Sequence, residues 1–201
     1  MTTTGPAVVT DPSQLIEFYS DHRAVHIYAL ADLEEPFWTP SRWYRNGNAV
    51  VGLVQLPDGE GAAVYAVSTS GPDETLELMV ELVPDLPAGQ LITGPVGLAA
   101  AVGATRELMW YGPHVRYELV DRTKLPVRSP VAVDLSARDA ADVEALLATE
   151  PGAAFFLPHM LEGETFVGIR EADRLVAVAG THVVSDAQRL AAVGAVYTPV
   201  S

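Results

Sequence analysis

Two stretches of the chain share one layout, in which three short apolar runs are joined by short polar connections. The first stretch covers residues 42–69, with Asn46-Gly47 and residues 57–61 between its runs. The second covers 165–198, with 171–173 and 185–188 in the corresponding places. Connections of this length join antiparallel strands, and Asn-Gly between apolar runs is a strong signal for a tight hairpin. The sequence therefore predicts two regions of antiparallel sheet.

Helical patterns precede both stretches. Asp11-Pro12 predicts a helix start, because the carboxylate caps free N–H groups and proline tolerates the first helical position. His26, Ala29, Leu30 and Leu33 have the spacing of one helical face, and Ser136 with Asp139 predicts a capped helix over 140–147. A further helix is expected from Asp73 to Pro84, and short strands at 90–93, 107–111, 115–120 and 131–135. The fold class predicted is α/β (α+β) with mixed, mostly antiparallel sheets.

Composition excludes several classes of protein. The 201 residues include no Cys, and 12 Lys plus Arg against 26 Asp plus Glu give a net charge of −14. Disulfide scaffolds, thiol nucleophiles and Cys-type zinc sites are excluded, and nucleic acid and anionic membranes are not expected as partners. No apolar run approaches the ~18 residues of a membrane span, and no secretory signal is read, so a cytoplasmic location is expected.

A basic segment with two prolines, residues 122–130, is the predicted linker between two domains, 1–125 and 131–201. Helix, helix and three strands are expected in the same order on both sides of it. The third strands are alike in sequence, since residues 62–69 and 191–198 are identical at six of eight positions. This similarity indicates an internal duplication.

Residues 168–182 and 192–198, preceded by a strand and two helices, resemble the GNAT-type N-acetyltransferase superfamily. The resemblance is to bacterial members with a degenerate acetyltransferase-like domain ahead of the working one. It implies tandem modules, with acetyl-CoA as cofactor and a small-molecule or peptide amine as acceptor. It also implies cofactor contacts through the backbone of Val196, Tyr197 and Thr198. His182, near the end of the expected third strand, is the candidate general base, with a structural histidine as the alternative.

The sequence departs from that family at the pyrophosphate site. The family holds the pyrophosphate with an Arg/Gln-x-x-Gly-x-Gly/Ala loop and the helix after it, and this chain reads Pro199-Val200-Ser201 where the loop would follow. The corresponding place in the first module contains Pro72, Asp73 and Glu74, which disfavour an anion. We therefore expect a second module cut off after its fourth strand, with weak or no turnover.

The alternative function is a non-catalytic module for dimerisation or small-ligand binding. An uncovered apolar fourth strand exposes an edge that another chain can pair with, so a homodimer is expected.

Other residues are assigned structural roles. His22 and His26 stand four apart, but two ligands do not make a metal site, so no metal is predicted and both are expected to be partly exposed on a helix. Clusters around Trp38, Trp43 and Trp110 are expected in the core or at a domain interface. Glu162 and Glu164 are assigned to a solvated turn, with an amine-binding cleft as the alternative, and Tyr197 to packing.

Overall fold

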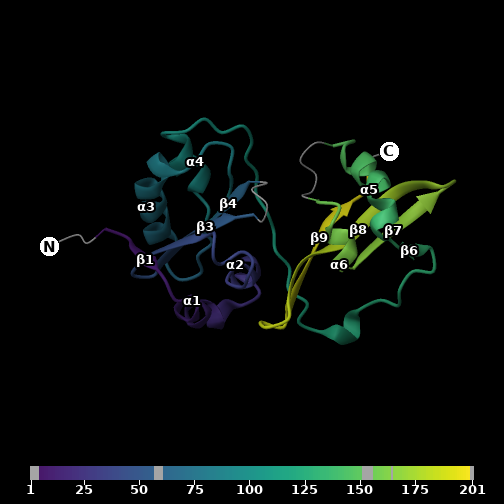
Figure 1. Ribbon diagram of the computed structural model, residues 1–201, viewed down its shortest axis with the longest axis horizontal. Helices are drawn as coiled ribbons and strands as arrows, with labels where there is room; N and C mark the ends of the chain where they lie inside the picture. The colour runs from purple at the N-terminus through teal and green to yellow at the C-terminus, as the bar shows by residue number, and fades with distance from the viewer. Residues whose placement is uncertain (1–4, 57–60, 151–155, 164, 200–201) are drawn as a thin grey trace. The chain divides into compact units, whose positions relative to one another are not determined.

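The computed structural model describes residues 5–56, 61–150, 156–163 and 165–199. Contacts divide the chain into two compact units, Met1–Tyr117 and Glu118–Ser201, and each is described by itself (Figure 1). The boundary lies close to the predicted linker, in which one 3₁₀ turn, η4 (Arg122–Lys124), is formed. The predicted α+β class is confirmed, and no helix in the described ranges is long and apolar enough to cross a membrane.

Unit 1 contains a five-stranded sheet in the order β1-β2-β3-β4-β5. Its antiparallel strands are β1 (Ala7–Val9), β2 (Arg42–Asn46), β3 (Ala49–Gln55) and β4 (Ala62–Tyr65), and β5 (Leu91–Thr93) runs parallel to β4. Between β1 and β2 lie α1 (Pro12–Tyr19), η1 (Ser20–His22) and α2 (Ile27–Asp32). Between β4 and β5 lie α3 (Pro72–Leu82) and η3 (Val83–Asp85), and α4 (Leu98–Gly103) follows β5.

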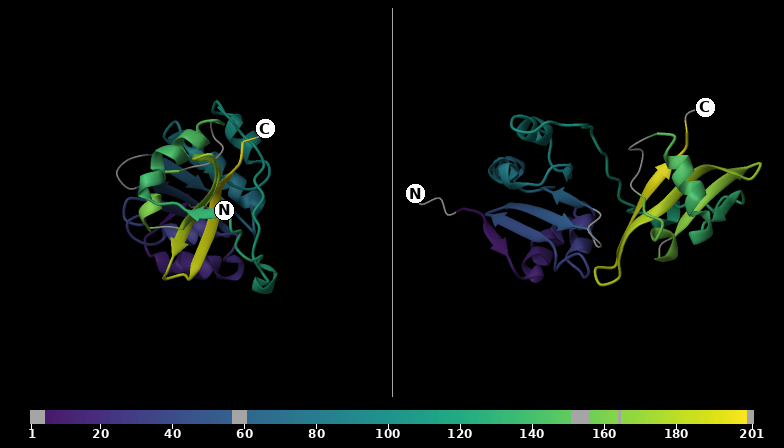
Figure 2. Two further views of the ribbon diagram at one scale, coloured as in Figure 1. Left: turned by 90° about the vertical axis from the view of Figure 1, so that its right-hand side faces the viewer. Right: turned by 45° about the horizontal axis from the view of Figure 1, so that its top comes forward.

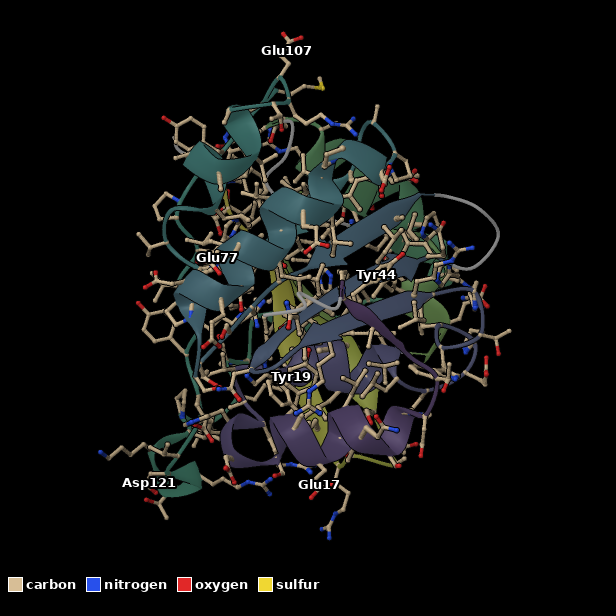
Figure 3. All side chains as sticks on the ribbon, turned by 90° about the vertical axis from the view of Figure 1, so that its left-hand side faces the viewer. Glu17, Tyr19, Tyr44, Glu77, Glu107 and Asp121 are labelled. Carbon is tan, nitrogen blue, oxygen red and sulfur yellow. The ribbon has the colours of Figure 1, made fainter. Side chains whose placement is uncertain are left out.

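Local chemistry explains where these elements begin. The Asp11 side chain accepts a hydrogen bond of 2.9 Å from the Ser13 N–H, and Pro12 is the first residue of α1, as predicted. One face of the sheet packs against α3 and α4 through a core that includes Val51, Val64 and Met79. Between the paired strands β2 and β3, Trp43 lies against Gly52, where a Cβ atom would come within 2.5 Å of the indole ring. Figure 3 shows Tyr19 between α1 and the sheet.

Unit 2 contains a four-stranded antiparallel sheet in the order β6-β7-β8-β9. Its strands are β6 (Ala132–Asp134), β7 (Phe166–Glu171), β8 (Arg174–Ser185) and β9 (Leu190–Tyr197). Between β6 and β7 lie η5 (Ala137–Asp139), α5 (Ala140–Leu147) and α6 (Met160–Gly163). The predicted capping box of Ser136 and Asp139 is present, and α5 lies against the sheet (Figures 1 and 2).

Both units follow one order: a strand, two helices, then three strands that pair in sequence. The units differ at the fourth strand. In unit 1, β5 pairs with the far edge of β4, whereas β9 pairs only with β8 among the described residues, so that its other edge is open.

Several sequence predictions are wrong. No strand forms at 107–111 or 115–120, because neither segment pairs with a strand among the described residues, and Val115 and Tyr117 are 72% and 92% exposed. β4 ends at Tyr65 rather than Thr69. The short strand β1 and the helix α4 were not predicted. Trp43 is buried as expected, but Trp110 is exposed in its own unit.

Candidate functional site

The predicted cofactor-binding residues lie on β9, whose pairing with β8 is irregular. The register shifts between Val178 and Gly180 and again between Thr181 and Val183. Opposite the first shift, Ala195 has a φ of 48°, a left-handed conformation that a residue with a side chain seldom adopts. An extra residue of this kind bends a strand and turns its backbone groups out of the regular ladder. The bend directly precedes Val196 and Tyr197.

His182 lies at the second irregularity, between the pairs Thr181–Val193 and Val183–Ala192, and its side chain lies against Gly194. A Cβ atom on Gly194 would come within 2.7–2.9 Å of the Cβ, Cγ and Nδ1 atoms of His182, so only glycine leaves room for the imidazole. The ring is half-buried, and this burial lowers the pKa of His182 below its ordinary value. The neutral form therefore predominates at neutral pH, which is the form that a proton acceptor needs.

The three residues expected to contact the cofactor, Val196, Tyr197 and Thr198, have different surroundings. The side chains of Val196 and Thr198 are exposed, whereas Tyr197 is buried and its hydroxyl lies 2.8 Å from the Thr149 Oγ1 atom. The packing role predicted for the Tyr197 side chain is thus confirmed.

Unit 1 holds a polar cluster that the sequence did not reveal, and Arg116 is at its centre. The Arg116 Nη1 atom donates to the Val25 carbonyl oxygen and to the Tyr65 hydroxyl, the latter at 2.8 Å. The Tyr65 hydroxyl donates to the same Val25 oxygen at 3.2 Å. The Arg116 Cζ atom lies 4.9 Å from the centre of the Tyr28 ring and 5.6 Å from that of Tyr65.

Burial dominates the electrostatics around Arg116. It raises the pKa of Asp32 to about 7 and lowers the pKa of His26 to about 4, where the charges of Arg116 and His22 add to the effect. Burial also raises the pKa of Tyr65, while the positive charge of Arg116 opposes that rise and the charge of Asp32 adds to it. Arg116 supplies the positive charge of this cluster.

The expectation that His26 is partly exposed is wrong, because only 2% of this residue is accessible. Its ring stacks on Tyr19 at 4.4 Å, and its Nε2 atom lies 3.3 Å from Thr69 Oγ1. His22 belongs to η1 and His26 caps α2, so the pair does not share a helix face. Across the described ranges, no group of three or more His, Asp and Glu side chains is placed to hold a metal.

The N-terminus of α3 in unit 1 carries its own acid. A Cβ atom on Gly71, the residue before the helix, would lie 2.6 Å from Oε2 of Glu74, so the carboxylate reaches back to the helix start. A carboxylate at that end interacts favourably with the helix dipole and occupies the place that an anionic ligand would take. The sequence-based exclusion of a phosphate site here has this physical basis.

An open groove of about 760 Å³ lies on the same sheet face as α3. Its lining includes Tyr44, Leu53 and charged side chains of both signs, namely Arg42, Glu81 and Asp85. The mixture favours neither cations nor anions. Of the two remaining candidates, Glu162 is exposed, and Glu164 lies outside the described residues.

Comparison of the chain with protein-family models, with curated proteins and with solved structures returned no match.

Proposed function

We propose that this chain is an N-acetyltransferase-like protein in which β9 of unit 2 would contact the thioester arm of acetyl-CoA. The observation that carries the proposal is the bend at Ala195 on a strand with an open far edge. Backbone N–H groups released from a regular ladder at such a bend can hydrogen-bond a carbonyl and its developing negative charge. Acetyl-CoA supplies an activated acyl group, and an amine is the acceptor class.

His182 is the residue proposed to take the proton of an ammonium acceptor. It lies on β8, the strand next to β9, with its side chain against Gly194, and burial keeps the pKa of its imidazole below the ordinary value. A neutral imidazole can accept a proton at pH 7, and the amine that results is nucleophilic. His182→Gln is therefore expected to reduce any acetyl transfer without weakening the binding of the thioester.

The proposed site on β9 suits the thioester arm of acetyl-CoA and not its phosphates. The sequence contains no Arg/Gln-x-x-Gly-x-Gly/Ala segment, and Glu74 takes the helix N-terminus in unit 1. Unit 1 is accordingly proposed to be non-catalytic. We expect weak binding and weak or no turnover, with the phosphates of acetyl-CoA adding nothing to affinity.

Backbone-amide NMR tests this proposal with two probes, S-acetylpantetheine and acetyl-CoA. Amide signals of residues 193–198 are expected to shift with both probes, at similar dissociation constants. Val133→Ala, on the opposite edge strand β6, is the matched control and should leave the titration unchanged. Shifts centred on α3, tight binding of acetyl-CoA alone, or no shifts on β9 would each overturn the proposal.

The proposed homodimer would use the same edge of β9. This strand has no charged residue between Leu190 and Tyr197, so two copies can approach along it without like-charge repulsion. A dimer of this kind is expected to dissociate when S-acetylpantetheine is added. Sedimentation at micromolar concentration measures both states, and a monomeric mass without the probe would count against the dimer.

A further inference from the structure

Arg116 is held in a small cage that has the properties of a cation-binding site. Two oxygens, the Val25 carbonyl and the Tyr65 hydroxyl, accept hydrogen bonds from one guanidinium nitrogen. The rings of Tyr28 and Tyr65 lie within 4.9 and 5.6 Å of the Cζ atom. Aromatic faces attract cations, and a planar guanidinium can stack on a ring while it donates hydrogen bonds at its edge.

The cage walls are fixed by contacts that do not involve Arg116. Tyr65 is the last residue of β4, is buried, and donates its own hydrogen bond to the Val25 oxygen. The Val25 and His26 N–H groups both donate to the His22 carbonyl, at 3.0 and 3.2 Å. The His26 ring is in turn stacked on Tyr19. The site would therefore keep its shape if the guanidinium left.

Arg116 itself comes from an open segment. Residues 104–121 are described throughout and contain no helix or strand, and Figure 2 shows them as an extended trace. The two neighbours of Arg116, Val115 and Tyr117, are largely exposed. The cage holds the guanidinium group of Arg116. Another cation could replace this group without disrupting any helix or strand, because residues 104–121 form neither.

The groups that face the cage favour positive charge. Two titratable side chains of α2 and its start lie near the site. The half-buried Asp32 carboxyl is close enough to Tyr65 for its negative charge to act on that hydroxyl, and His26, at the start of α2, is buried. The Val25 carbonyl oxygen and the Tyr65 hydroxyl oxygen can both accept hydrogen bonds from the N–H groups of a cation. Among the residues that the structure describes, Arg116 is the cation that contacts these oxygens and rings.

We propose that this cage is a binding site for small molecules bearing a guanidinium group, and that Arg116 is its tethered internal ligand. An alkylguanidinium from solution would take the same two oxygens and the same two rings, and it would release the Arg116 side chain. The site is argued from unit 1 alone and does not depend on the acetyltransferase-like proposal for unit 2.

The test uses Arg116→Ala and ethylguanidinium, which replaces the atoms that this substitution removes. If Arg116 fills the cage about nine-tenths of the time, the variant is expected to bind ethylguanidinium about tenfold more tightly than the original chain. NMR signals of the Tyr28 and Tyr65 rings report occupancy. Ethylammonium is expected to bind more weakly, because it cannot stack and donate along one edge together. Potassium chloride at equal ionic strength is the salt control.

Arg122→Ala removes a charge from the neighbouring η4 turn and should leave the affinity at the original value. In the Arg116→Ala background, Tyr65→Phe removes one of the two oxygens and is expected to weaken binding about tenfold. Should Arg116→Ala fail to fold, Arg116→Gln keeps donors without charge and is expected to show the same gain. Equal affinity in the Arg116 variants and the original chain, or an equal gain with Arg122→Ala, would overturn the proposal.

Discussion

At the scale of single residues, His26 makes the stability of unit 1 depend on pH. Burial lowers its pKa from 6.5 to about 4, so the unfolded chain takes up a proton first as the pH falls. The stabilisation is fully present above pH 6.5 and is lost towards pH 4, and it amounts to about 3 kcal/mol over that range. Asp32, whose pKa is raised to about 7, acts in the opposite sense between its unfolded value of 3.8 and 7.

The effect of His26 is therefore measured as a difference between variants. His26→Phe keeps the stacking on Tyr19 and removes the titration, so its urea unfolding free energy should fall less between pH 7 and 5 than that of the original chain. His22→Gln, an exposed change in η1, removes one of the charges that lower the pKa of His26 and should therefore reduce the pH dependence much less than His26→Phe does. Equal slopes for all three chains would show that His26 is not buried in its neutral form.

Gly180 is the residue at which a single methyl group should do most harm to unit 2. A Cβ atom there would overlap three ring carbons of Phe166, which is itself buried in the core. Gly180→Ala is expected to lower the free energy of unfolding by about 2 kcal/mol, as overpacking does. Gly163→Ala, where no atom lies within 4 Å of the new Cβ, is the control and should be close to neutral.

At the scale of elements, α3 carries acids at both of its ends, and their effects should have opposite signs. Glu74 lies in the first turn, where it favours the helix dipole, and Glu81 lies in the last turn, where it opposes it. Glu74→Gln should destabilise unit 1 and Glu81→Gln should stabilise it, each by about 0.5 kcal/mol at low salt. Denaturant unfolding measures both, and a common sign would contradict the placement of the Glu74 carboxylate.

Elements with local signals were the ones that sequence predicted well. The first hairpin, the Asp11 cap and the Ser136 capping box each depend on residues a few positions apart, although the hairpin turn is formed by Gly47-Asn48 and not by the expected Asn46-Gly47. Residues 115–120 show strand-like alternation as clearly, but alternation does not supply a partner strand. β1 was missed because three residues give little pattern, and its partner β2 is more than thirty residues away.

The Arg116 cluster has no local signal at all. Arg116 is 51 residues from Tyr65 and 91 from Val25, and nothing in its own neighbourhood marks it out from the other arginines. By contrast, the positions on β9 were found because a run of residues resembled a known pattern. Their geometry, with the bend at Ala195 and the Gly194–His182 contact, became visible only in the structure.

At the scale of the whole molecule, each unit has its own hydrophobic core and is expected to unfold as a unit. The three tryptophans, at 38, 43 and 110, all belong to unit 1, so indole fluorescence follows that unit alone. The Arg106 Nη2 atom donates to the carbonyl oxygens of Val83, Pro84 and Leu86 at 2.7–3.0 Å. Loss of these bonds in Arg106→Ala should cost about 2 kcal/mol.

Fluorescence should therefore detect Arg106→Ala and not Gly180→Ala, whereas circular dichroism should detect both. Arg138→Ala, an exposed change in unit 2, is the control and should leave both signals unaltered. A shift of the fluorescence transition by Gly180→Ala would contradict independent unfolding of the two units.

The cage around Arg116 should also affect how fast a protease cuts the chain after this residue. Trypsin must draw an arginine side chain into its own acidic pocket before it cuts, so the enzyme and the tyrosine cage compete for the same guanidinium. The Arg116–Tyr117 bond lies in a segment without helix or strand, but it is protected while Val25 and Tyr65 hold the Arg116 side chain. Within the described part of the chain, the Arg122 side chain beside the Arg122–Thr123 bond has no such contact. The rate of cleavage after Arg116, relative to that after Arg122, therefore measures the fraction of time for which Arg116 is outside the cage.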